Sequence, residues 1–216
     1  MGRRKKEPKS VHRDNIASAA QDLFMKNGIE ATSMDDIAKA AGYSKATLYV
    51  YFENKEEIAG LLVLESMKKL YAYIAAALEE QETTKARYYY ICRGLVKYQE
   101  EFPFYFKMAL DKINVDFDSG SYLQEEQETY CVGEEINEKI RQFLCDGIEK
   151  GEIRAGLKVL PTIFVFWGML AGLVQTAANK ERYIEKEMKL SKEKFLEYGF
   201  DTLYHSITTK EEKYER

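Results

Sequence analysis

The chain of 216 residues has little proline and little histidine, and it lacks the alternating patterns typical of strands. Proline occurs only three times, which permits long helices. Runs of β-branched residues that alternate with polar ones are lacking, so strands have little support. The two histidines, His12 and His205, have no cysteine or carboxylate at metal-ligand spacing. We therefore expect an all-α protein without a metal site or a cofactor.

Catalytic motifs are lacking as well. The sequence contains no dinucleotide-binding glycine fingerprint, no P-loop, no nucleophile elbow and no kinase signature. Its many carboxylates read as solvated helix faces, as in residues 185–187. The cysteines Cys92, Cys131 and Cys145 form no CxxC motif and are typical of free thiols in a reducing cytoplasm. We predict no catalytic residue and a cytoplasmic location, and an enzyme is the least favoured alternative.

One uncharged run, from Val159 to Ala178, is 20 residues long and so long enough to cross a bilayer. Pro161 and Gln175 interrupt its apolar character. A helix that is apolar on all sides can equally be buried inside a helical protein or its dimer. We favour that interpretation and expect no membrane partner, while a membrane-associated helical protein remains the alternative.

The first 60 residues are divided into short helices by turn and cap signals. Ser33 with Asp36 resembles a capping box, Ser44 is a second N-cap, and Asn54 with Glu57 starts a further helix. Apolar spacing and these signals predict helices over residues 10–26, 34–40, 44–51 and 55–80. Longer helices are predicted over residues 84–101, 103–116, 122–150, 157–180 and 191–212.

The second and third short helices form a helix-turn-helix candidate, with Gly42 in the turn between them. Ile37, Leu48 and Phe52 are predicted to bury the inner face. The opposite face of the third helix carries residues 46, 49 and 50, which are alanine, tyrosine and valine. Such a face suits entry into a major groove about 12 Å wide, although a plain small helical core remains the alternative.

The same segment carries a dense motif: Ile16-x-x-Ala19-Ala20-x-x-Leu23-Phe24-x-x-x-Gly28-x-x-x-Thr32-x-Met34-x-x-Ile37-Ala38-x-x-Ala41-Gly42-x-Ser44-x-x-Thr47-Leu48-Tyr49-x-Tyr51-Phe52-x-x-Lys55. This motif resembles the DNA-binding domain of the tetracycline-repressor (TetR) family over about residues 10–58. The resemblance implies an N-terminal three-helix DNA-binding domain followed by a C-terminal helical domain for ligand binding and dimerisation. We expect a flexible basic arm at 1–9, the DNA-binding domain at 10–54 and the effector and dimerisation domain at 55–216.

The resemblance also implies roles for individual residues toward double-stranded DNA. Four of them match phosphate-contacting positions: Ser33, Thr47, Tyr51 and Lys55. Four others match positions near base edges: Ser44, Lys45, Ala46 and Tyr49. Lys45 is suited to guanine O6 and N7, and the Ala46 methyl group to a thymine methyl.

The C-terminal part is rich in aromatic residues, which favours an apolar cavity for a small apolar or aromatic effector. A plain aromatic core is an equally open interpretation. The candidate pocket residues are Tyr89, Phe102, Tyr105, Phe106, Met108, Phe164 and Trp167. The candidate residues of a homodimer interface, which would present two recognition helices to a palindromic operator, are Gly168, Gly172, Leu196, Phe200, Leu203 and Ile207. Together these features predict a repressor that a ligand releases from DNA.

The net charge of −4 is an average over unlike parts. Residues 1–60 carry a balance of +1, and residues 61–216 carry −5. Within the first part, residues 1–14 alone carry +4, which suits either a DNA-contacting arm or a solubilising tail. Because the DNA-binding part is only weakly basic, we expect its specificity to depend on hydrogen bonding and shape in residues 44–51.

Overall fold

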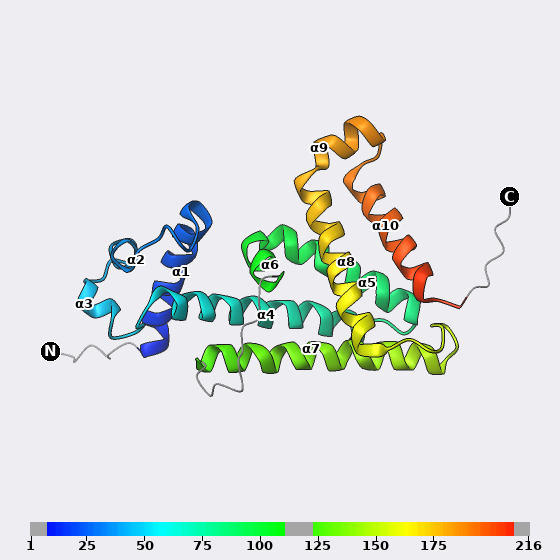
Figure 1. Ribbon diagram of the computed structural model, residues 1–216, viewed down its shortest axis with the longest axis horizontal. Helices are drawn as coiled ribbons and strands as arrows, with labels where there is room; N and C mark the ends of the chain where they lie inside the picture. Colours follow the sequence, from blue (N-terminus) through cyan, green and yellow to red (C-terminus); the bar gives the residue numbers. More distant parts are fainter. Residues whose placement is uncertain (1–7, 111–122, 210–216) are drawn as a thin grey trace. The chain divides into compact units, whose positions relative to one another are not determined.

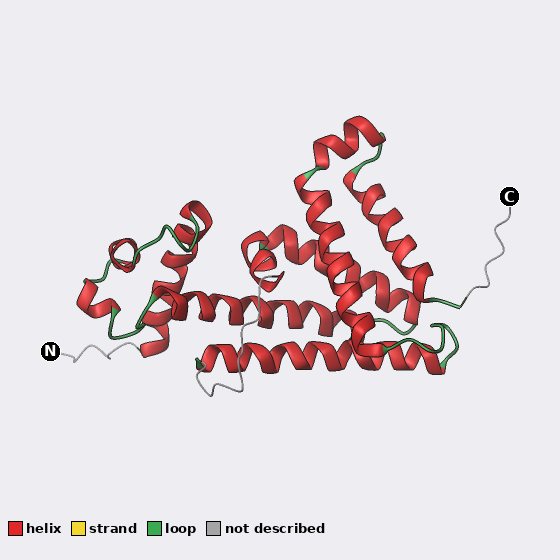
Figure 2. Cartoon of the chain, viewed as in Figure 1, coloured by secondary structure: helices red, strands yellow, loops and turns green. Residues whose placement is uncertain are grey.

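The computed structural model describes residues 8–110 and 123–209, and all of the long elements in this part of the chain are α-helices (Figures 1 and 2). The basic residues at positions 3–6 and the second half of the predicted 103–116 helix lie outside the described residues. The helices are α1 (Lys9–Asn27), α2 (Met34–Ala41), α3 (Lys45–Leu48), α4 (Lys55–Glu79), α5 (Thr84–Glu101), α6 (Pro103–Leu110), α7 (Gln124–Glu149), α8 (Val159–Asn179), α9 (Glu181–Tyr183), the π-helix η1 (Ile184–Met188) and α10 (Lys192–Ile207). The expected all-α class is confirmed.

Two local features differ from the sequence prediction. Helix α3 ends at Leu48 because the following amides turn more tightly, with Val50 N–H donating to the Thr47 carbonyl at 3.1 Å. The short elements α9 and η1 were not predicted, since they are too brief to show a helical period. Buried Ile184 anchors them, and Lys189, at a φ of +56°, ends η1 in the left-handed region.

The described part of the chain divides into two compact units. Among the described residues, the N-terminal unit contains 8–67 and 123–130, and the C-terminal unit contains 68–110 and 131–209. The boundary between the units falls within α4, which continues without a break beyond the helix-turn-helix. The first turns of α7 also belong to the N-terminal unit.

The N-terminal unit is held together by apolar side chains from its first four helices. Helix α1 packs on α2, and α2 packs on α3. The predicted inner face is confirmed, because Ile37, Leu48 and Phe52 are all buried. Further core residues are Ile16, Ala20, Phe24, Ile58 and Leu62. The short α3 therefore takes its stability mainly from its packing, because a single helical turn is not stable alone.

In the C-terminal unit, α8 packs against α5 and α10, as Figure 1 shows for the yellow and orange helices. Gly199 lets α8 and α10 approach closely, because a β-carbon there would lie 2.4 Å from Leu173 Cδ2. Tyr88 is buried among these helices, and its hydroxyl donates to the Phe200 carbonyl at 3.0 Å. Burial raises the pKa of the Tyr88 phenol and raises that of the neighbouring Cys92 thiol to about 12, so this cysteine is an inert core residue.

Candidate nucleic-acid interface

The helix-turn-helix begins with a complete capping box on α2. The Ser33 hydroxyl accepts a hydrogen bond from Asp36 N–H at 3.2 Å, and the Asp36 carboxylate accepts one from Ser33 N–H at 3.2 Å. The hydrogen bonds from Ser33 lower the pKa of the Asp36 carboxyl below its usual value. The predicted cap is therefore confirmed, and it satisfies two amides that helix α2 leaves without an intrahelical partner.

Gly42 ends α2 and sets the direction of the chain toward α3. Its φ of +75° and ψ of 23° lie in the left-handed region. Tyr43 N–H then donates to the Ala38 carbonyl at 2.9 Å, which closes the turn. Ser44 follows as the N-cap of α3 and accepts a hydrogen bond from Thr47 N–H at 3.1 Å. The turn and both caps are as predicted.

Replacing Gly42 with alanine should lower the free energy of unfolding of the N-terminal unit by about 1–2 kcal/mol. The cost is conformational, because a β-carbon at this position meets no atom within 4 Å. Asparagine adopts the left-handed region more readily, so Gly42→Asn should cost less than Gly42→Ala. Urea unfolding followed by circular dichroism measures both. Equal stability of the alanine variant and the unsubstituted protein would contradict the assigned turn.

The face of α3 that the sequence predicted to point outward is exposed to solvent. Ala46, Tyr49 and Val50 are exposed, whereas Leu48 and Phe52 on the opposite side are buried. Tyr49 is 46% exposed and Val50 is 68% exposed. An exposed, largely uncharged helix face of this kind is able to enter a major groove.

A hollow of about 510 Å³ lies beside this face, bounded by the start of α2, by α3 and by the start of α4. Four of the eight predicted DNA-contacting residues line it: Ser33, Lys45, Tyr49 and Lys55. Residues 44, 46 and 47 continue along α3 next to Lys45. The structure thus gathers residues from three helices at one surface, although the acidic Glu30, Asp35, Glu53 and Glu56 line the same hollow.

Lys55, at the start of α4, is held by the loop before α2. Its Nζ donates to the carbonyls of Ile29 and Glu30, each at 2.9 Å. An ammonium group has three N–H donors, so these two bonds leave one donor to point elsewhere. This loop contact could not be predicted from the sequence, because the partners are backbone atoms about 25 residues away.

Tyr51 lies in a cluster of rings that the sequence did not predict. Its ring centroid is 5.2 Å from that of His12 and 6.3 Å from that of Tyr43. His12 Nδ1 forms a 2.7 Å hydrogen bond with the Tyr43 hydroxyl. These contacts fix the position of Tyr51 next to the recognition helix and make His12 and Tyr43 positioning residues of the same surface.

Arg13 is a second residue that sequence reasoning did not single out as structural. Its Nη1 donates to the Tyr51 carbonyl at 2.6 Å and to Glu57 at 3.0 Å, and its Nη2 donates to Glu125 at 2.5 Å. The guanidinium carbon also lies 4.1 Å from the centre of the Phe52 ring. Arg13 therefore joins α1, the turn after α3, the first turn of α4 and the first turn of α7.

The seven predicted effector residues do not all belong to one cluster of rings. Phe102 stacks on Tyr105, and Phe106 packs with them through Tyr98, whereas Tyr89 lies in a separate group with Tyr88 and Tyr204. Phe106 and Met108 are buried. Phe164 is 60% exposed on α8. Trp167 is half-buried.

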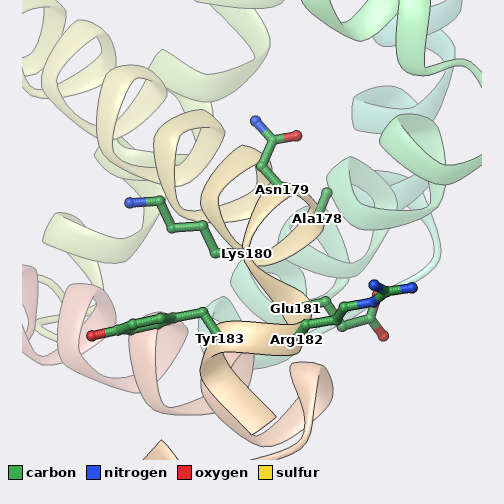
Figure 3. A pocket seen from close by; sticks show the side chains of 6 residues that line it. All are labelled: Ala178, Asn179, Lys180, Glu181, Arg182 and Tyr183. Carbon is green, nitrogen blue, oxygen red and sulfur yellow. The ribbon is translucent and has the colours of Figure 1, made fainter. Parts of the chain in front are cut away.

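A hollow of about 560 Å³ in the C-terminal unit lies where α8 meets α9 (Figure 3). It is lined by the consecutive residues 178–183, and none of the seven predicted effector residues contributes to it. Figure 3 shows the side chains of Lys180 and Tyr183 extending to one side and that of Arg182 extending to the other. Such a diverging polar surface does not resemble an apolar ligand pocket, which has convergent walls.

The predicted dimer residues differ in exposure between α8 and α10. Leu196, Phe200 and Ile207 are buried within the protomer. Leu203 is half-buried. Gly168 and Gly172 are exposed, and a β-carbon at either would meet no atom within 4 Å. The glycine pair therefore lies on an open part of the α8 surface.

These elements define a class of protein: two capped short helices, a left-handed glycine turn and an exposed second helix form a DNA-binding helix-turn-helix. The profile of the family described as "Bacterial regulatory proteins, tetR family" matches residues 16–61. Residues 16–61 thus match a tetR-family DNA-binding domain, and the chain is similar to TetR-family transcriptional regulators.

Known relatives match well beyond this domain. The fatty acid metabolism regulator protein of Bacillus subtilis is 26% identical over 188 residues, which cover 83% of this chain and 89% of the relative. The solved structure of the TetR family regulator PfmR of Thermus thermophilus is 26% identical with a TM-score of 0.65, covering 88% of this chain and 97% of that one. The fatty acid degradation regulator FadR of Bacillus halodurans has the same fold, with a TM-score of 0.67 at 20% identity over 93% of this chain and 97% of that one.

Proposed function

We propose that this regulator is a cytoplasmic repressor that binds a pseudo-palindromic operator as a homodimer and leaves it when a small molecule binds. The observation that carries this proposal is the exposed face of α3, with residues 46, 49 and 50 uncovered beside the hollow that Ser33, Lys45 and Lys55 line. A regulator with two such faces, one from each protomer, would read two half-sites about one helical turn apart.

The proposed DNA contacts follow from the placement of these side chains. Ser44, Lys45, Ala46 and Tyr49 occupy α3 or its cap and are proposed to face base edges. Ser33, Thr47, Tyr51 and Lys55 surround them and are proposed to face phosphates. Hydroxyl and ammonium donors around a reading helix fix its register on the duplex, while the helix face itself supplies sequence preference.

The proposed dimer interface is the outer face of α8. Leu160, Phe164, Val165 and Met169 are exposed there, next to the open positions Gly168 and Gly172. Helix α8 is long and apolar enough to cross a membrane, yet only 22% of its most apolar window is buried within one chain. A contiguous apolar patch of this kind is stable in water only when something covers it, and a second copy of α8 covers it symmetrically.

The proposed effector is a largely apolar molecule bound among the aromatic side chains of the C-terminal unit. The ring cluster of Tyr98, Phe102, Tyr105 and Phe106, with Lys69 Nζ 4.5 Å from the Phe102 ring centre, supplies apolar walls and one cation. The Bacillus subtilis relative regulates fatty acid metabolism, as its name states. Long-chain acyl compounds are therefore the first class to test, by their effect on operator affinity.

Selection of bound sites from random double-stranded DNA tests the proposal. We expect a pseudo-palindrome with two half-sites. Ala46→Glu should reduce affinity for that site by about 100-fold or more, because it places a carboxylate against the base edges and phosphates. Ala46→Ser is the matched control and should keep most of the affinity. Failure of the unsubstituted protein to enrich any sequence would contradict the proposed function.

A further inference from the structure

An ion pair in the hollow beside α3 joins the two short helices α2 and α3. Asp35 lies in the first turn of α2, and Lys45 is the first residue of α3. The Asp35 Oδ1 and Lys45 Nζ atoms are 2.7 Å apart. Both side chains are about three-fifths exposed, at 61% and 60%, so the pair is open to whatever this surface binds.

The position of Asp35 calls for an explanation, because a carboxylate on a DNA-facing surface repels phosphates. The neighbouring acid, Asp36, is engaged in the capping box of α2. The Asp35 carboxylate instead reaches across to α3 and lies in the hollow with Ser33 and Tyr49. Its hydrogen bond raises the pKa of the Lys45 ammonium.

The lysine donor and the aspartate acceptor side by side match the major-groove edge of a G·C base pair. In the major groove, guanine presents the acceptors N7 and O6, and the cytosine paired with it presents the N4 amino donor beside them. Lysine donates to the guanine acceptors, and aspartate accepts from the cytosine amino group. A thymine at the same place would turn its O4 acceptor and its methyl group toward the carboxylate, which is unfavourable.

We propose that Asp35 is a specificity-determining residue that reads, together with Lys45, one G·C pair in each half-site. Lys45 donates to the guanine and Asp35 accepts from the cytosine N4 amino group. The pair is nearly neutral, so it adds little attraction to unrelated DNA and gains its energy only where the base edge matches. This inference rests on the proposed DNA-reading role of α3 and adds a base-reading residue from α2.

The test compares the DNA sites selected by the full-length protein and by its Asp35→Asn variant from random duplexes. Aspartate is a pure acceptor, whereas the asparagine amide also donates and loses the selectivity for a cytosine amino group. We expect the variant to keep the rest of the motif but to lose about tenfold or more of its preference for G·C at one position per half-site. Lys45→Met should lose preference at the same or the adjacent base pair. Because Asp35 is exposed, circular dichroism should show both variants folded.

Glu56→Gln is the matched control, since Glu56 is an exposed acid lining the same hollow. It should raise the affinity for all sequences alike without changing base preference. If Asp35→Asn does the same, the carboxylate is only a surface charge and the proposal is overturned. If the unsubstituted protein selects no site, the DNA-reading function itself fails, which is a distinguishable result.

Discussion

Replacing Arg13 with methionine is expected to lower the free energy of unfolding of the N-terminal unit by about 2–3 kcal/mol. The guanidinium bridges Glu57 and Glu125, whose side chains are only 15% and 16% exposed. Methionine would retain much of the apolar packing on Phe52 but leave two poorly solvated carboxylates facing each other. Loss of one partner of a shielded ion pair costs more than the pair itself contributes, because the remaining charge is unpaired.

Two variants separate charge from geometry in this network. Arg13→Lys keeps a cation but loses the fork that reaches the Tyr51 carbonyl and both carboxylates at once, so its loss should be intermediate. Adding Glu125→Gln to Arg13→Met should recover part of the loss, since it removes one of the unpaired charges.

Hydrogen exchange followed by mass spectrometry is suited to locate the effect of Arg13→Met. Protection should fall in α1, α3 and the first turns of α4. Trp167, the single tryptophan, lies in α8. Its fluorescence reports on the C-terminal unit and serves as an internal control. Unchanged protection in α1 and α3 would show that Arg13 carries no net stability.

A charge introduced on the outer face of α8 is expected to have the largest effect on DNA binding. Phe164→Glu should convert the proposed dimer to a monomer and reduce affinity for a two-half-site operator by about 100-fold or more. The reason is that a monomer engages one half-site and loses the gain from linked binding. The protomer itself should stay folded, because Phe164 is 60% exposed and contributes little to its core.

Light scattering measures the oligomeric state, and fluorescence anisotropy with a labelled operator measures the affinity. Met25→Glu is the control, since Met25 is a similarly exposed apolar residue, at 55%, in the N-terminal unit. It should leave the dimer intact. A monomeric unsubstituted protein at micromolar concentration, or one that sediments with membranes after lysis, would assign the exposed α8 face to another role.

Local signals of the helix-turn-helix were readable from the sequence because their partners are only a few residues apart. The Ser33–Asp36 box, the left-handed Gly42 and the Ser44 cap each depend on contacts within four residues. Spacing also separated the buried Leu48 and Phe52 from the exposed Ala46 and Tyr49. The resemblance to the TetR family then added the expected roles of these exposed positions.

The partners of the site residues were not readable in the same way. The carboxylate of Asp35 meets Lys45 only because the Gly42 turn brings α2 and α3 together. Lys55 binds two backbone carbonyls, which carry no residue-specific signal. Arg13 and Glu125 are 112 residues apart, and no local pattern connects them.

The C-terminal helices show the same division. Their lengths and the all-α class follow from apolar spacing and scarce proline, which act within each helix. Which side of α8 faces the core does not follow from apolar spacing, because a helix without charged residues has no polar stripe to mark its outer side. Packing against α5 and α10 selects Leu170 and Val174 for the core and turns Phe164 outward. The sequence alone thus determined the helices and the helix-turn-helix, whereas the tertiary structure decided which helix faces remain exposed for binding.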